Sequence, residues 1–225
     1  MLNILLETPN LLAIDKPSGL LVHRGMAADK VTLVDLVADY LQSKTTYPMH
    51  RLDRGTSGVI LFAKDSETAR VLQTQFTEHT IQRTYIALVR GAFTESKVLD
   101  HPVPKGEGKE RVPATTSFEP IEVLPATPRT LSLVQAQPKT GRFHQIRRHL
   151  KHLNHPIIGD ANYGKGALNR EIASAYGIER LALHAAELVF QDPASGSEIK
   201  VLSPIPLDLA QGIERLRAST TDNAS

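Results

Sequence analysis

The amino-acid sequence predicts a fold that mixes short β-strands with amphipathic α-helices. Apolar runs rich in Val, Ile and Leu are bounded by Gly, Pro, Asn and Asp, as is typical of strands that end in turns. Elsewhere, apolar residues recur at helical spacing behind a capping residue. Hydrophobic residues make up 41% of the 225 residues, so the chain can bury a core. No apolar run approaches the ~20 residues that span a bilayer, and no signal peptide is indicated.

The N-terminal elements begin with a predicted strand at residues 11–16, which ends at a Pro-Ser-Gly turn. A helix is expected from its N-cap, Thr32, to about residue 44. The apolar run at 58–64 predicts a buried strand. Asp65 or Ser66 then caps a second predicted helix that ends near residue 79.

The middle of the chain is predicted to be rich in strands. Residues 82–91 show the alternation of apolar and polar side chains that marks a strand. Residues 101–113 hold so much Pro, Gly and charge that they predict a long surface loop. Two further strands are predicted at 116–124 and 130–137, separated by a turn that contains proline.

The C-terminal part begins with a predicted helix at 142–153, directly after a glycine turn. Residues 180–190 and 198–202 predict two strands joined by a segment of turn-forming residues. A last helix is expected at 206–218, which leaves 219–225 as a disordered tail.

Charge is distributed unevenly, although the net charge is only +2. No acidic residue occurs from Val123 to Gly159, and this local positive field is of the kind that attracts phosphate groups. The cationic and histidine residues in this stretch are Arg129, Lys139, Arg142, His144, Arg147, Arg148, His149, Lys151, His152 and His155. The absence of cysteine excludes disulfides and thiol catalysis, and it is compatible with a reducing compartment such as the cytoplasm.

Asp53 is predicted to lie on a polar, glycine-containing loop that leads into the buried strand at 58–64. Arg51 and Arg54 flank it, and nearby positive charge favours an ionised carboxylate. Asp53 is therefore expected to act as a charged acceptor or nucleophile, unless it only braces the turn.

Three histidines at short spacing, His149, His152 and His155, raise the question of a metal site. No carboxylate or cysteine joins them, and no His-Glu-x-x-His motif occurs, so the sequence favours no metal. The helix that carries them is instead expected to hold phosphates, with Arg148 and Lys151 in that role.

Three motifs carry a resemblance to a known family. The sequence His50-Arg51-Leu52-Asp53-x-x-Thr56-Ser57-Gly58 resembles the catalytic-loop signature of the RluA-type pseudouridine synthases. The pattern Arg-x-Tyr-x-Ala-x-Val-x-Gly around Tyr85 is similar to the second family motif, and Lys-Thr-Gly-Arg-x-His-Gln-Ile-Arg, which ends at Arg147, is similar to the third. The resemblance extends from about Ile14 to Pro206. It implies an α+β fold with a mainly antiparallel mixed sheet, surrounding helices and loops, and a central active-site cleft.

The resemblance implies an isomerase that converts a uridine of RNA to pseudouridine without a cofactor. Asp53 matches the indispensable catalytic aspartate, which attacks the sugar or the base or removes a sugar proton; these routes stay open. Tyr85 matches the tyrosine that stacks on the target base and takes part in proton transfer. Arg147 matches the arginine that lies against the aspartate and keeps it ionised.

Further residues are expected to contact the substrate. The loop at 101–113 resembles a family segment that reaches over RNA, with Lys105, Lys109 and Arg111 as phosphate contacts. The other predicted contacts are His50, Arg51, Arg54, Thr56, Lys139, Arg142, His144, Gln145, Arg148 and Leu183.

The resemblance also predicts the partner. Because the motifs start within the first residues, we expect a single catalytic domain over 1–218 with no preceding RNA-binding module. That feature and the sequence at 163–170 are similar to the branch that modifies a uridine in the T stem of tRNA. Ribosomal RNA is the alternative target. We expect a cytoplasmic monomer that does not bind membranes.

Two other classes of protein remain as alternatives. A catalytically silent RNA-binding protein of the same fold would not need Asp53, Tyr85 and Arg147 together. A glycoside or nucleoside hydrolase would need a second working carboxylate some ~5 to 9.5 Å from Asp53, for which Asp160 or Glu187 are the candidates.

Overall fold

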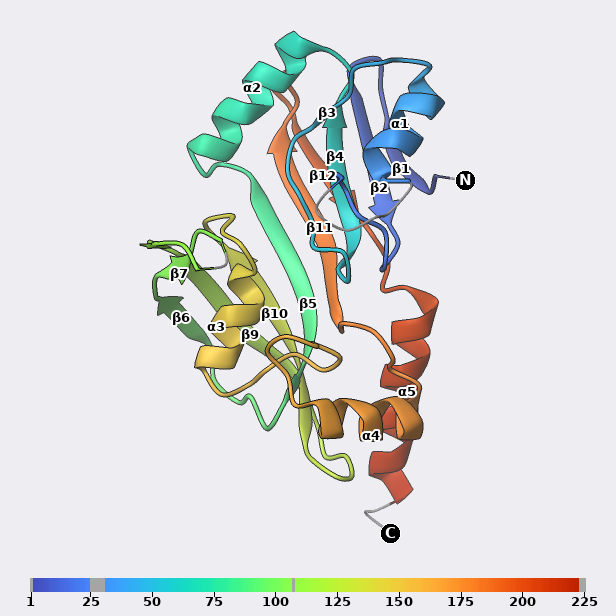
Figure 1. Cartoon of the computed structure of the whole chain (residues 1–225), viewed down its shortest axis with the longest axis vertical. Coiled ribbons are helices and arrows are strands. Elements are labelled where there is room, and N and C mark those ends of the chain that lie inside the picture. The colour runs from blue at the N-terminus through green and yellow to red at the C-terminus, as the bar shows by residue number, and fades with distance from the viewer. Residues whose placement is uncertain (1, 25–30, 107, 223–225) are drawn as a thin grey trace. The chain divides into compact units, whose positions relative to one another are not determined.

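The computed structural model describes residues 2–24, 31–106 and 108–222. It confirms the predicted α+β class, with five helices in the described residues and a mainly antiparallel sheet (Figure 1). The chain forms two compact units, Met1–Arg83 with Ala185–Pro204 and Thr84–His184 with Ile205–Ser225. It passes from one unit to the other inside strands β5 (Gln82–Arg90) and β11 (Leu183–Gln191), and again between Pro204 and Ile205.

The strands of the first unit lie in the order β1-β2-β4-β11-β12, and β3 also pairs with β4. Alternate residues of the two central strands, such as Leu11, Ala13, Val59 and Leu61, are buried against Leu72 of a helix. Every residue of β4 is buried, so its continuous apolar run reflects a strand covered on both faces. The bounds not yet given are β1 (Ile4–Glu7), β2 (Leu11–Lys16), β3 (Tyr47–Pro48), β4 (Ser57–Ala63) and β12 (Glu198–Leu202).

The two helices of the first unit begin at the predicted caps. Helix α1 (Leu33–Leu41) starts with a capping box, in which Thr32 accepts from the backbone N–H of Asp35 and the Asp35 carboxylate accepts from that of Thr32. Helix α2 (Ser66–Thr77) is capped by Asp65, whose carboxylate accepts from Thr68 N–H at 2.8 Å. Helix α1 ends before the predicted residue 44, because Gln42 adopts a left-handed conformation.

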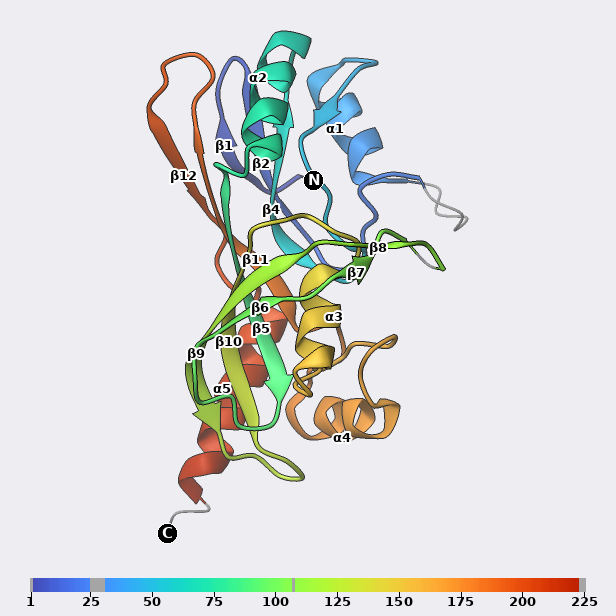
Figure 2. The same cartoon turned by 90° about the vertical axis from the view of Figure 1, so that its left-hand side faces the viewer.

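The second unit contains a sheet in the order β5-β10-β9-β6 (Figure 2). Thr116 of β9 points to α3, where its hydroxyl lies 2.9 Å from His149 Nδ1. Beyond a bulge in β9, Glu122 points to the opposite face and pairs with Arg217 of α5. The bounds are β6 (Lys97–Asp100), β9 (Thr115–Leu124), β10 (Leu131–Pro138), α3 (Gln145–His152), α4 (Gly166–Tyr176) and α5 (Leu207–Asp222).

Several sequence-based boundaries are wrong. The segment predicted as a loop at 101–113 contains a two-stranded hairpin, β7 (Val103–Pro104) with β8 (Arg111–Val112), because the backbone N–H of Lys105 bonds to Glu110 O and closes it. Helix α4 was not predicted. Helix α5 extends through residues 219–222, which were expected to be a disordered tail, and residues 223–225 lie outside the described residues.

Candidate active site

Asp53 lies on a turn directly before β4, which confirms its predicted place on a loop leading into a buried strand. The turn is closed by a hydrogen bond from Thr56 N–H to Asp53 O of 3.0 Å. Asp53 is half-buried, whereas Thr56 is buried and Arg51 is exposed. The turn thus holds the aspartate at a defined position between core and solvent.

A buried lysine stabilises this loop through hydrogen bonds. Lys16 at the end of β2 has no exposed surface, and its ammonium group donates to Pro17 O at 2.9 Å, Leu20 O at 2.8 Å and Arg54 O at 3.2 Å. The lysine therefore joins the Pro-Ser-Gly turn to the loop of Asp53. Sequence reasoning missed this role, for which the only signal was the position of the lysine directly before the turn.

Arg54 makes a second link between these segments. Its Nε donates to Gly19 O at 3.0 Å, and its carbonyl accepts from Gly19 N–H at 2.8 Å. These two hydrogen bonds of Arg54 position the loop of Asp53. The substrate contact that the sequence predicts for Arg54 stays a prediction.

Gly58 explains why glycine follows Thr56-Ser57. Its φ of +112° is in the region that favours glycine, and a Cβ atom there would lie 2.1 Å from Ala185 O. The backbones of β4 and β11 therefore approach more closely than any side chain permits, directly after the loop of Asp53.

His50 holds the other end of the loop. Its Nε2 accepts from Leu61 N–H at 3.1 Å, so the proton of the neutral ring is on Nδ1. Burial, followed by the positive charge of Arg83, lowers the pKa of His50 to about 3. His50 thus helps to fix the loop on β4, and the substrate contact expected of it stays a prediction.

Tyr85, in the second unit, is predicted to stack on the target base. It lies on β5 opposite Ala136 of β10, and its side chain is buried with 8% exposed. Leu183, predicted to wall the base pocket, is buried at the start of β11. Both residues are therefore buried residues of strands.

Arg147 is bound by an acidic residue that sequence reasoning did not pair with it. Its Nε and Nη2 donate to the two carboxylate oxygens of Asp160 at 2.8 and 2.9 Å, and Asp160 has almost no exposed surface. Backbone N–H groups of Asn162 and Tyr163 also donate to this carboxylate. The expected pairing of Arg147 with Asp53 stays a prediction, whereas the pair with Asp160 fixes the plane of the guanidinium group.

The same pair argues against a hydrolase. Burial alone would raise the pKa of Asp160, but hydrogen bonds and the charge of Arg147 outweigh it and hold the pKa below its ordinary value. A glycosidase acid needs a raised pKa. Asp160 is therefore not poised to donate a proton. Glu187, the other candidate, forms an ion pair with Lys200.

Tyr163 was not predicted as a site residue. Its ring lies 5.1 Å from the guanidinium carbon of Arg147 and 5.3 Å from that of Arg148. Its hydroxyl lies 3.0 Å from Nδ1 of His144, a predicted substrate contact. His144 has a left-handed backbone with φ of +54° at the start of α3 and stacks on Phe143. This conformation is uncommon in non-glycine residues, although histidine adopts it more often than most, and here it marks the N-cap of α3.

Gln145 is buried, and its amide group is committed to protein contacts. The amide oxygen accepts from the Thr140 hydroxyl and from Arg142 N–H, and the amide nitrogen donates to Thr115 O and the Thr116 hydroxyl. These contacts position α3 against β9, and the substrate contact expected of Gln145 stays a prediction.

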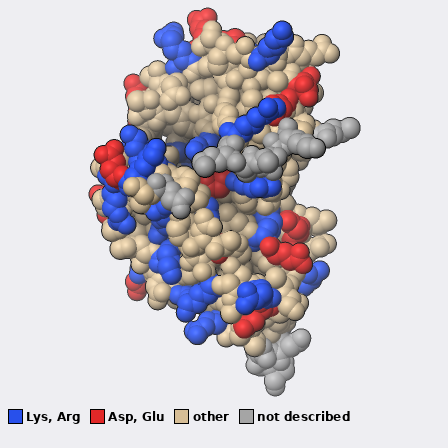
Figure 3. Space-filling view, viewed as in Figure 1, with Lys and Arg blue, Asp and Glu red and all other residues tan. Residues whose placement is uncertain are grey.

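The other predicted contacts of this unit lie at the surface. Lys139 and Arg142 are exposed and Arg148 is half-buried. Figure 3 shows Lys and Arg side chains gathered over α3 and the β7–β8 hairpin. This supports the predicted positive field, although the hairpin that contributes to it was expected to be a loop.

The histidines considered for a metal have other roles. His149 Nε2 lies 2.9 Å from His101 O, and its Nδ1 contacts Thr116, while His155 Nδ1 lies 2.8 Å from Arg90 O. Burial lowers the pKa of His149. Among the described residues, no three His, Cys, Asp or Glu side chains are grouped to hold a metal.

Within the same residues, no helix combines the length and apolar character of a membrane span.

The family follows from these motifs and from comparison with known proteins. A model of the RNA pseudouridylate synthase family matches residues 10–152, which include Asp53, Tyr85 and Arg147. The chain therefore belongs to the RNA pseudouridylate synthase family and is an isomerase.

Individual relatives are similar over most of the chain. It is 38% identical over 212 residues to tRNA pseudouridine synthase C of Vibrio cholerae, which covers 86% of each chain. It is 39% identical over 219 residues to the protein of that name from Haemophilus ducreyi, which covers 89% of each. The structure of Human RNA Pseudouridylate Synthase Domain Containing 4 has a TM-score of 0.76 and 26% identity, covering 96% of this chain and 93% of that one.

Proposed function

We propose that the protein converts a uridine in the T stem of tRNA to pseudouridine. The observation that carries the choice of tRNA is the similarity, over 86% of both chains, to a Vibrio cholerae protein named as a tRNA pseudouridine synthase. The T-stem site rests on the sequence resemblance at 163–170. The lack of cysteine agrees with the reducing cytoplasm, where we place a monomeric enzyme.

The reaction breaks the N1–C1′ bond of the uridine, turns the base and joins C5 to C1′. A proton leaves C5 and N1 gains one, so substrate and product contain the same atoms and no cofactor is consumed. Asp53 supplies the carboxylate that begins the reaction, presented by the turn before β4. Lys16 and His50 keep this turn in place, which supports a preorganised carboxylate.

Tyr85 and Arg147 have supporting roles in this proposal. The ring of Tyr85 stacks on the target base, and its hydroxyl serves the proton transfer. Arg147 supplies positive charge in a fixed direction because Asp160 binds two of its nitrogen atoms.

The target base must leave its stack inside a folded RNA, which costs a few kcal/mol. Cationic side chains that bind the backbone on either side of the base offset this cost. Lys139, Arg142 and Arg148 are the proposed contacts, and they lie near or on α3.

The test compares the protein with its Asp53→Asn variant on unmodified bulk tRNA and ribosomal RNA, with pseudouridine mapped by carbodiimide-stop sequencing. We expect one new stop in the T stem that disappears in Asp53→Asn but persists in Asp39→Asn, a matched change at an exposed residue. A stop in ribosomal RNA alone would replace the tRNA target. Binding of both RNAs without any stop would instead support the silent RNA-binding protein.

A further inference from the structure

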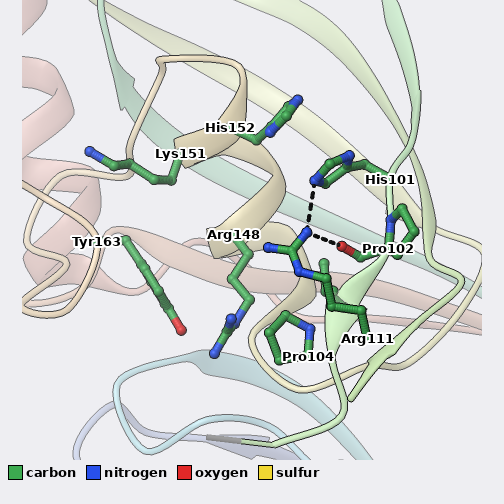
Figure 4. Close-up of a pocket in the computed structure, with 9 residues that line it drawn as sticks. His101, Pro102, Pro104, Arg111, Arg148, Lys151, His152 and Tyr163 are labelled. Carbon is green, nitrogen blue, oxygen red and sulfur yellow. Dashed lines mark hydrogen bonds between the residues drawn. The ribbon is translucent and has the colours of Figure 1, made fainter. Parts of the chain in front are cut away.

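A basic pocket lies between the β7–β8 hairpin and α3, within the second unit (Figure 4). Its volume is about 220 Å³, and its lining includes Arg111 from the hairpin and Arg148 and Lys151 from the helix. None of the described lining residues is acidic. Arg111, Arg148 and Lys151 thus bring positive charge to the border of one small space, which favours an anion there.

The size of the pocket restricts the anion. Pockets for drug-sized molecules typically hold ~300 to 1,000 Å³ and are mainly apolar. This pocket is smaller, and its walls include the apolar residues Pro102, Val103 and Pro104. The guanidinium groups of Arg111 and Arg148 at its border nevertheless suit a phosphate group. Tyr163 also borders it and contacts Arg148, so the pocket adjoins the group that holds Arg147.

Two histidines also line the pocket. The rings of His101 and His152 are stacked with centroids 4.0 Å apart. Arg111 Nη1 lies 3.2 Å from His101 Nε2 and donates to Pro102 O at 3.0 Å. Because a guanidinium group only donates, Nε2 of His101 is the acceptor and its proton is on Nδ1. A neutral His101 therefore lies at the rim of a cationic pocket.

We propose that this pocket binds one phosphodiester group of the RNA substrate, and that binding is coupled to protonation of His101. The inference rests on the proposed function for its choice of RNA. The arriving phosphate accepts from Arg111 and from the newly protonated Nε2 of His101, in place of the bond between these two side chains. Arg148 and Lys151 supply the remaining positive charge.

The sign of the coupling follows from the groups around His101. Burial, followed by the charges of His152 and Arg111, lowers the pKa of His101. The ring of His149 also contacts the backbone carbonyl of His101. Asp100, the residue before His101, has a carboxylate that accepts from the Thr115 hydroxyl. A bound anion favours the charged ring, so RNA binding takes up a proton and becomes tighter as the pH falls from 7.5 to 6.

The first experiment measures the affinity of the full chain for a T-arm RNA hairpin against salt concentration. Lys151→Ala should reduce the slope of log affinity on log salt by about one, and Arg111→Ala should act similarly. Lys151→Arg should restore the slope. Lys97→Ala, which removes an exposed charge on β6, is the matched control. Slopes in Lys151→Ala and Arg111→Ala equal to that of Lys97→Ala would overturn the pocket.

The coupling is tested with His101→Asn, which keeps an acceptor for Arg111 but cannot be protonated. Its RNA affinity should change less between pH 7.5 and 6 than that of the wild type. An unchanged pH dependence would remove His101 from the proposal.

A second probe separates this inference from the proposed function. Histidine ring resonances of the full chain are followed by NMR during titration with inorganic phosphate. The pocket predicts that phosphate raises the pH midpoint of the His101 signal, whatever the enzyme modifies. An unchanged midpoint would overturn the pocket even if T-stem pseudouridine forms, whereas a shifted midpoint without pseudouridine would overturn only the function.

Discussion

The loop of Asp53 and the start of α3 are held in different ways. The loop is fixed mainly by the backbone: Lys16 binds three carbonyl groups, and Gly58 permits a close approach to Ala185. The start of α3 is fixed by side chains, chiefly the pair of Arg147 with Asp160 and the ring of Tyr163. A loop fixed through the backbone is sensitive to shape, whereas a helix end fixed by side chains is sensitive to charge.

The largest effect should come from breaking the backbone contact. In Gly58→Ala the new methyl group would meet Ala185 O, and φ would be strained, so the free energy of unfolding should fall by about 4 kcal/mol. Urea denaturation measures this loss. Gly196→Ala, at a φ of +71° with open space around it, is the control and should lose only about 1 kcal/mol. Equal losses would show that β4 and β11 can separate without cost.

The matching change in the second region removes charge without changing shape. Asp160→Asn removes the negative charge that pairs with buried Arg147 and should lower the free energy of unfolding by about 3 kcal/mol. Pseudouridine formation should fall more than RNA affinity, because the guanidinium plane is released. Glu179→Gln, an exposed change in the same unit, should change neither. Full activity in Asp160→Asn would separate this pair from catalysis.

A pH change tests how the loop of Asp53 is held, because acid protonates the imidazole ring of His50. The pKa of His50 is about 3 in the folded protein and near its ordinary value of about 6.5 when unfolded. Below pH 6.5 the unfolded chain therefore binds the proton first, and stability falls by about 2 kcal/mol by pH 5. His50→Asn should lack this part of the acid sensitivity. Urea denaturation at pH 7.5 and pH 5 measures the free energy of unfolding of the wild type and of His50→Asn. An equal loss in the two proteins would contradict the role of His50 in fixing the loop.

The smallest effect should come from one hydroxyl group. Tyr163→Phe keeps the ring on Arg147 and Arg148 but removes the hydrogen bond to His144, at a cost of about 1 kcal/mol. Tyr163→Leu removes the ring as well and should lower pseudouridine formation further. Equal activity of the two variants would show that the ring does not position Arg147.

The parts of the site that were predictable are those set by local sequence. The cap at Thr32, the loop before β4 and the strand of Tyr85 each follow from neighbouring residues. The partners of Lys16 and Arg147 were not predictable, because Arg54 and Asp160 meet them only after folding. The β7–β8 hairpin was also missed. The Pro and Gly content of this segment predicts a loop, and the backbone hydrogen bonds that pair its two strands form only when the chain folds.

The burial of Lys16 makes its amino group a chemical reporter. An acylating reagent modifies exposed lysines such as Lys97 quickly, but it reaches Lys16 only when the Pro-Ser-Gly turn separates from the loop of Asp53. The rate of Lys16 acylation, followed by mass spectrometry, therefore measures how often that loop opens in the native protein.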